Sequence, residues 1–300
     1  MINIFRIEVS LLLLTRLCVT SYTTKVPVVL WHGMGDSCCF SYSLGKVKSV
    51  LEENIPGVYV KSIRIGTNNI EDVENSFFKS VNEQIEQVCQ ELSMDEKLKH
   101  GYNAIGFSQG AQFLRAVAQK CGGPQMQNLI SLGGQHQGVY GLPNCASIKH
   151  YFCDMIRRML HYAAYTKYVQ NNLVQAQFWH DPNREEEYRK RSTFLSDINN
   201  ELQINETYKR NLKKLKNLVL VKFDHDQMVQ PAISEWFGFY KPGQAVEIET
   251  LHNSKLYIED RLGLKEMDAN GKLHFISLDS KHLQFDIEWF IEAIINKFLV

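Results

Sequence analysis

The feature that most constrains the fold is an alternation of strand-like and helix-like segments that runs from Val28 to about Gly134. Short apolar runs rich in β-branched residues are followed by longer runs with apolar residues at helical spacing. The strand-like runs are VVLW, GVYVKSIRIG, YNAIGFS and NLISLGG, and the helix-like runs between them are SYSLGKVKSVLEEN, NSFFKSVNEQIEQVCQEL and AQFLRAVAQK. Parallel strands need long crossover connections, which are usually helical. The rhythm therefore predicts an α/β fold built on a parallel sheet.

The second half of the chain breaks this rhythm and then restores it. Residues 139–216 show mostly helical spacing, and no convincing strand interrupts them. Strand-like runs return at residues 217–223 and 272–278, and the helix-like run IEWFIEAIINKFL closes the chain. We therefore predict one α/β domain over residues 22–300, with a mostly parallel sheet and a helical insertion at about 139–216.

The first 21 residues resemble a secretory signal peptide. Arg6 precedes a short apolar run at residues 9–14, and small residues lead to a cleavage site near Ser21. The alternative is a buried first strand or helix. The run is too short to span a bilayer, and no other apolar stretch reaches that length. We therefore expect a mature protein without a transmembrane segment.

The cysteine count and the charge balance indicate which kinds of bond and ligand to expect in this protein. Seven cysteines are present, and one lies in the predicted signal, which leaves an even six. An even number in a secreted chain favours disulfides, and Asn205 begins the single N-glycosylation sequon. The sequence has no C-x-x-C pair to indicate a zinc or thioredoxin-type site, and we expect no metal and no cofactor. Acidic and basic residues balance at 33 each, so no net field favours nucleic acid.

A serine between two glycines marks the end of one predicted strand and the start of a helix. Gly106-Phe107-Ser108-Gln109-Gly110 matches G-x-S-x-G, the pattern of a nucleophile elbow. The turn in such an elbow is so tight that glycine is needed on both sides. It would place Ser108 at a helix N-terminus, where amide donors favour developing negative charge. The alternative is an ordinary glycine turn without chemistry.

An active serine needs a histidine base, and the chain order of this fold is serine, then acid, then histidine. His282 lies between the last predicted strand and the last helix, at the sheet edge where Ser108 should lie. His32 and His136 come too early for this order but could line the site. The histidines that fit less well are His32, His100, His136, His150, His161, His180, His225, His252 and His274.

The acid should follow the strand at residues 217–223. Asp224 and Asp226 both qualify, and spacing favours Asp226 without excluding Asp224. A capping turn is the alternative interpretation of this stretch. The oxyanion of an ester intermediate also needs two donors. We expect one from the amide of Gln109 and one from the loop HGMGD after the first strand.

Several longer strings carry a specific resemblance that covers the chain from about residue 26 to its end. They are WHGMGDSCC, DVENSFF, GFSQG, FLRAVAQ, GGQHQGVYGLP, SEWFGFY and RLGLKEMD. The chain resembles the lysosomal palmitoyl-protein thioesterases, a family with the α/β-hydrolase fold. The resemblance implies that Ser108, Asp226 and His282 form the catalytic triad. It also implies that the amides of Met34 and Gln109 form the oxyanion hole.

The resemblance further implies three disulfides, Cys38–Cys39, Cys89–Cys121 and Cys145–Cys153. The first is unexpected from the residues alone. Adjacent α-carbons lie about 3.8 Å apart, whereas disulfides usually join α-carbons at least about 4.4 Å apart. Without the resemblance, Cys38 and Cys39 are expected to be free or separately bonded.

The predicted function is hydrolysis of thioesters that join long-chain fatty acyl groups to protein cysteines. Expected partners are S-acylated proteins or peptides and fatty acyl thioesters, in the lysosome or along the secretory pathway. A lipase or carboxylesterase acting on oxygen esters is one alternative, and a catalytically silent lipid carrier is another. Apolar residues of the insertion are candidates for the wall of an acyl groove: Phe152, Met155, Ile156, Met159 and Leu160.

Overall fold

The computed structural model of the chain describes residues 25–141, 155 and 159–300. Its centre is a six-stranded sheet with the order β2-β1-β3-β4-β5-β8, in which every neighbouring pair is parallel. The strands are β1 (Val28–Trp31), β2 (Val60–Ser62), β3 (Tyr102–Phe107), β4 (Met126–Leu132), β5 (Asn217–Phe223) and β8 (Leu273–Leu278). The mostly parallel α/β-hydrolase sheet predicted from the sequence is confirmed. The predicted signal peptide lies outside the described residues.

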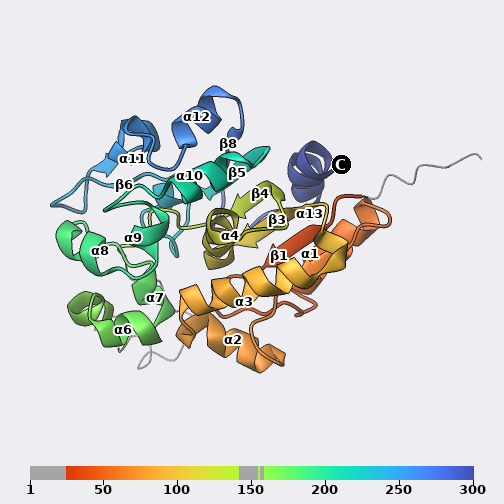
Figure 1. Cartoon of the computed structure of the whole chain (residues 1–300), viewed down its shortest axis with the longest axis horizontal. Coiled ribbons are helices and arrows are strands. Elements are labelled where there is room, and N and C mark those ends of the chain that lie inside the picture. The colour runs from red at the N-terminus through yellow and green to blue at the C-terminus, as the bar shows by residue number, and fades with distance from the viewer. Residues whose placement is uncertain (1–24, 142–154, 156–158) are drawn as a thin grey trace, which may run out of the picture.

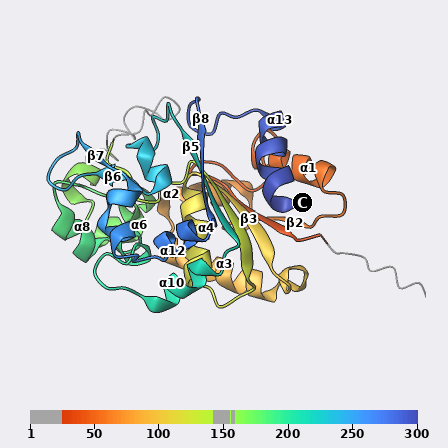
Figure 2. The ribbon, with the colours of Figure 1, turned by 90° about the horizontal axis from the view of Figure 1, so that it is seen from above.

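Helices cover both faces of the sheet (Figures 1 and 2). One face carries α1 (Leu44–Asn54), α13 (Ile287–Phe290) and the π-helical segment η4 (Ile291–Leu299). The other carries α2 (Asn69–Phe78), α3 (Val81–Met94), the short η1 (Glu96–Leu98) and α4 (Gln109–Lys120). Strands β1 and β3 are buried along their whole length. This double coverage explains why they are continuous apolar runs rather than alternating ones.

Two segments differ from the sequence expectation. The strand expected within GVYVKSIRIG is only three residues long, at β2. The single helix expected across NSFFKSVNEQIEQVCQEL is divided into α2 and α3, because Lys79 and Ser80 have extended ψ angles of 129° and 131°. The side-chain amide of Gln84 donates to the carbonyls of Asn75 and Lys79. The Asn75 carbonyl also accepts the amide of Lys79, and Gln84 supplies a donor to the Lys79 carbonyl beyond the end of α2.

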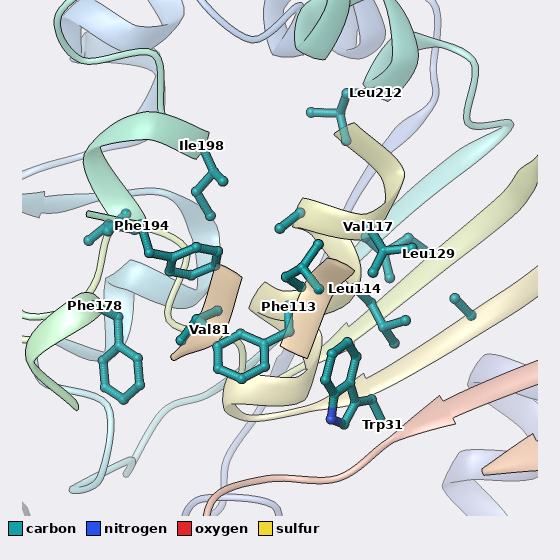
Figure 3. Close-up of a cluster of buried hydrophobic side chains, with 14 of the residues drawn as sticks. Trp31, Val81, Phe113, Leu114, Val117, Leu129, Phe178, Phe194, Ile198 and Leu212 are labelled. Carbon is teal, nitrogen blue, oxygen red and sulfur yellow. The ribbon is translucent and has the colours of Figure 1, made fainter. Parts of the chain in front are cut away.

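The described part of the region between β4 and β5 contains short helices, of which α10 and the segment around α9 pack against α4. They are α6 (Lys167–Asn172), α7 (Val174–Gln177), α8 (Glu185–Arg191), α9 (Leu195–Ile198) and α10 (Glu206–Lys213). Figure 3 shows Phe194 and Ile198 beside Phe113 of α4, and the rings of Phe113 and Phe194 meet edge to face at 5.6 Å. Each is fully buried, which is worth about 1.5–3 kcal/mol per side chain.

The segment between β5 and β8 contains elements that the sequence pattern did not indicate. They are η2 (Ala232–Trp236), the antiparallel pair β6 (Phe239–Tyr240) and β7 (Ile248–Glu249), η3 (Leu251–Asn253), α11 (Lys255–Ile258) and α12 (Leu264–Ala269). Within the described ranges, none of the helices has the length and apolar content needed to traverse a bilayer.

Candidate active site

Ser108 occupies a strained turn between β3 and α4. Its backbone has φ 53° and ψ −124°, a conformation that costs a non-glycine residue about 1–3 kcal/mol. A Cβ on Gly106 would lie 2.3 Å from Ala111 Cα, and one on Gly110 would lie 2.4 Å from the carbonyl oxygens of Trp31 and His32. Both glycines are therefore required by close backbone contacts, as the elbow interpretation predicts.

The loop after β1 lies directly against this turn. A Cβ on Gly33 would approach Ser108 Cβ to 3.1 Å. Met34 and Gln109 line the same pocket as Ser108. Within the described residues, no hydrogen bond occupies the backbone N–H of either one. Both amides are therefore free to donate to a bound oxyanion, whose charge they would stabilise.

His282 follows β8 and forms a hydrogen bond through Nδ1 with Asp226 Oδ2. Asp226 follows β5, and its Oδ1 accepts the amides of Met228 at 2.6 Å and Val229 at 2.9 Å. Among the described residues Nε2 of His282 has no hydrogen-bond partner, and the side chain lines the pocket that contains Ser108. The imidazole thus has one nitrogen fixed by a carboxylate and one available at the pocket.

Gly133, the residue after β4, makes room for this imidazole. It has φ 64°, and a Cβ there would lie 3.0 Å from His282 Cε1. Leu283, next to His282, also has a positive φ of 56°. Gly133 was not among the residues predicted for the site from the sequence. The signal available was the pair of glycines that ends the strand-like run NLISLGG.

The other candidate acid and histidines have different partners. Asp224 accepts hydrogen bonds from Lys222 and Ser277, and exposed His225 pairs with Asp279 at 2.6 Å. His136 is buried against Arg115, His32 is buried against Asp72, and neither ring lines the pocket. The expectation that these two could line the site was wrong, because buried polar partners engage both rings.

A second carboxyl group, Glu235 in η2, lies beside Asp226. Its side chain is fully buried. One side-chain oxygen or nitrogen atom from each of Asp226, Glu235 and His282 lies within 4.8 Å of the other two. Burial first, and then the hydrogen bond and charge of Asp226, raise the pKa of Glu235 to about 11. Burial opposes ionisation of Asp226 as well, but hydrogen bonds from His282 and Glu235 lower its pKa. One carboxyl is therefore neutral and the other ionised at neutral pH.

Glu235 was not among the residues predicted for the site. Its signal was an acidic residue within the aromatic stretch SEWFGF, where a solvated side chain is unexpected.

A separate buried pair, His32 and Asp72, holds the loop after β1. His32 Nε2 lies 3.0 Å from Asp72 Oδ1, and Nδ1 lies 2.8 Å from the carbonyl oxygen of Gly33. Asp72 also accepts the Ser37 hydroxyl and the amides of Cys38 and Ile65. Burial disfavours the ionised carboxylate, but these bonds, beginning with that of His32, lower its pKa.

The described residues contain two disulfides, and both match pairings implied by the resemblance. Cys38 and Cys39 are bonded to each other with α-carbons 3.8 Å apart, and Cys89 is bonded to Cys121 across 5.4 Å. The expectation from the residues alone, that Cys38 and Cys39 are free or separately bonded, was wrong. The Cys38 amide donates to Asp72 Oδ2 at 2.9 Å, so the buried Asp72 also contacts the segment that contains this disulfide. Cys145 and Cys153 lie outside the described residues.

The pocket at Ser108 has a volume of about 790 Å³ and is mainly apolar. Its walls come from both faces of the sheet. One side is formed by residues near α1 and the C-terminal helices, Tyr42, Leu44, Val47, Leu283, Phe285 and Ile287. The other side is formed near α2 and the insertion by Val73, Phe77, Val139, Leu160, Phe178 and Trp179. Ser108 lies where the two sides meet, at the edge of the sheet.

Of the three candidate groove residues that the structure describes, only Leu160 lines this pocket. Met159 packs against the core, and Met155 is 42% exposed. Phe152 and Ile156 lie outside the described residues. The groove wall on this side is instead built largely from residues that the sequence analysis did not name, such as Phe178 and Trp179.

A strained serine after a central strand and a histidine that is hydrogen-bonded to a carboxylate line one pocket of an α/β-hydrolase fold. This fold and site define a serine hydrolase.

The chain belongs to the palmitoyl protein thioesterase family, whose sequence profile matches residues 27–282. It is 51% identical over 296 residues to palmitoyl-protein thioesterase 1 of Caenorhabditis elegans, covering 99% of each chain. It is 29% identical over 251 residues to lysosomal thioesterase PPT2 of Rattus norvegicus, covering 82% of this chain and 78% of that relative. Among solved structures, the esterase Pf2001 of Pyrococcus furiosus aligns with a TM-score of 0.45 and 13% identity, over 91% of this chain and 79% of that one.

Proposed function

We propose that this chain is a thioesterase that removes long-chain fatty acyl groups, palmitoyl in particular, from cysteine residues of proteins. The observation that carries the proposal is the convergence of Ser108 and the His282–Asp226 pair on one apolar pocket. Membership of the palmitoyl protein thioesterase family supports the substrate class.

In the acylation step, Ser108 Oγ attacks the thioester carbonyl while His282 Nε2 takes the hydroxyl proton. Asp226 accepts from Nδ1, which fixes the tautomer and stabilises the imidazolium that forms. The amides of Met34 and Gln109 donate to the oxyanion. The carbon–sulfur bond then breaks, and the cysteine leaves as a thiol with the proton from the imidazolium.

In the deacylation step, water attacks the acyl-serine and His282 again acts as the base. The bond to Ser108 Oγ breaks, the serine regains its proton, and the fatty acid leaves. The acyl chain lies against the insertion side of the pocket, on residues such as Leu160, Phe178 and Trp179. An apolar wall gives affinity in proportion to the chain surface that it covers.

The direct test is Ser108→Ala, with the exposed Ser49→Ala of α1 as the matched control. We expect wild type and Ser49→Ala to release palmitate from a palmitoylated peptide thioester and to react with a fluorophosphonate. Ser108→Ala should do neither. Normal turnover by Ser108→Ala would overturn the proposal, and a wild-type protein that stays unlabelled would indicate a silent carrier. Paired rates on matched thioester and oxyester substrates would distinguish a lipase or carboxylesterase.

The same proposal includes passage through the secretory pathway to the lysosome. Two disulfides support an oxidising route, and the rat relative is named a lysosomal thioesterase. Asn205 is exposed, and its Oδ1 caps α10 by accepting the amides of Thr207 and Tyr208. This leaves Nδ2 for a glycan. Glycosidase treatment should increase the gel mobility of wild type and leave that of Asn205→Gln unchanged.

A further inference from the structure

Glu235 has an unusual position for a carboxyl group. It lies in η2, where Oε2 accepts the amide of Phe223, the last residue of β5, at 2.8 Å. Oε1 is buried and accepts no hydrogen bond from the described residues. Asp226 and His282 each have a side-chain O or N atom within 4.8 Å of a carboxyl oxygen of Glu235. A buried carboxylate oxygen without a donor is costly, whereas a buried O–H aimed at a neighbouring carboxylate is satisfied.

The charges around Glu235 favour the protonated form. Asp226, from the loop after β5, raises the pKa of Glu235 by hydrogen bonding and repulsion after burial itself has raised it. Lys222, from β5, acts in the opposite direction but is already paired with Asp224. His282, from the loop after β8, holds Asp226 in its ionised form. At neutral pH the two adjacent carboxyl groups therefore bind one proton between them, and that proton is on Glu235.

We propose that Glu235 is a positioning residue that donates its carboxyl proton in a hydrogen bond to Asp226. This inference rests on the proposed function, because Asp226 acts there through His282. The bond holds the carboxylate in the orientation that His282 requires, and it withdraws part of the negative charge that faces the imidazole. The proton stays on Glu235 throughout the reaction.

The test compares Glu235→Leu, which removes the donor, with Glu235→Gln, which replaces the O–H by an N–H. We expect Glu235→Leu to lose about 10- to 100-fold in kcat/KM, the effect of losing one hydrogen bond to a buried charge. The acid limb of its kcat/KM profile should move to higher pH, because the unshielded carboxylate attracts a proton to the pair more strongly. Glu235→Gln should recover most of the activity and the wild-type profile. Exposed Glu288→Gln on α13 is the matched control.

Three outcomes would overturn the inference. A Glu235→Gln profile whose acid limb moves to lower pH would mean that Glu235 is ionised in the wild type. Equal activity losses in both variants with unshifted profiles would mean a purely structural role through Phe223. Loss of wild-type activity on EDTA treatment, with recovery on adding back a divalent cation, would assign the three groups to a metal site.

A second measurement keeps the inference testable if Glu235→Leu does not fold. The infrared spectrum of wild type at neutral pH should contain the C=O stretch of one buried protonated carboxyl, and Glu235→Gln should lack it. Absence of that band in the wild type would overturn the inference. Fluorophosphonate labelling of the wild type separates this result from the proposed function. A labelled, active wild type without the band fails only the inference about Glu235.

Discussion

The described residues include two histidine–aspartate pairs whose carboxylates are fully buried, and the difference between the pairs shows what turns such a pair into a site. In the His32–Asp72 pair both ring nitrogens have partners, and both carboxylate oxygens accept two groups each. In the His282–Asp226 pair one ring nitrogen stays free among the described residues and lies at a pocket. The first pair is saturated and holds a loop, whereas the second keeps one position open for a substrate.

The largest expected effect comes from Asp226→Asn. The amide should preserve the contacts with Met228 and Val229 but favour the wrong tautomer of His282, so kcat should fall by about 10⁴-fold. The melting temperature should change little. Activity assays and thermal unfolding of the same preparation would check this. A variant with normal kcat would remove the distinction between the two pairs.

The matched change in the first pair is Asp72→Asn. Breaking this buried pair leaves His32 and several donors poorly satisfied, so we expect the free energy of unfolding to fall by about 3–5 kcal/mol. Urea unfolding measures that loss. The folded fraction, counted by fluorophosphonate labelling, should keep a far larger share of its kcat than Asp226→Asn. If Asp72→Asn removed activity without loss of stability, the contrast between the pairs would be wrong.

Gly133→Ala tests the space around His282 without touching its hydrogen bond. The positive φ alone should cost about 1–2 kcal/mol of stability, and displacement of the ring should lower kcat/KM by about 10- to 100-fold. Gly57→Ala is the control, because Gly57 has φ 81° with nothing within 4 Å of a Cβ. It should show the loss of stability without the loss of activity. Equal kinetics for the two variants would contradict the packing argument.

The variant with the smallest expected effect on activity is Glu235→Gln, which tests the pH dependence of stability created by the proton beside the second pair. Above the ordinary carboxyl pKa the unfolded chain loses the proton that folded Glu235 keeps up to a pKa of about 11. The folded state then binds more protons, so this group makes stability fall as pH rises across that range. Relative to wild type, Glu235→Gln should therefore gain up to about 1.4 kcal/mol per pH unit. Urea unfolding at pH 5, 7 and 9 would measure the gain, and a constant difference would exclude a neutral Glu235.

Much of the fold was predictable because it depends on local patterns. The range of β1 and that of β5 follow from apolar run length, and the turn at Ser108 follows from its two glycines. The place of His282 follows from the rule that parallel strands end at one edge. These features need only neighbouring residues and the sheet geometry.

The remaining features depend on contacts between distant residues. Asp72 is 40 positions from His32, and its role arises only when α2 packs behind the first loop. The neutral state of Glu235 comes from burial beside Asp226, which no run of letters indicates. The Cys38–Cys39 bond was unexpected from the residues alone, because its α-carbons are 3.8 Å apart, closer than disulfides usually join.

The order of the strands anchors the two partners of the reaction unequally. Ser108 follows β3, which has a neighbour on each side, whereas His282 follows β8, which lies at the edge and pairs only with β5 within the described sheet. Transient opening of proteins begins where backbone hydrogen bonds are fewest and most exposed. Fluctuations of β8 at this edge would move the imidazole of His282 away from Ser108 while the turn at Ser108 stays intact. Enzymatic activity would then report the breathing of one strand rather than the stability of the whole sheet.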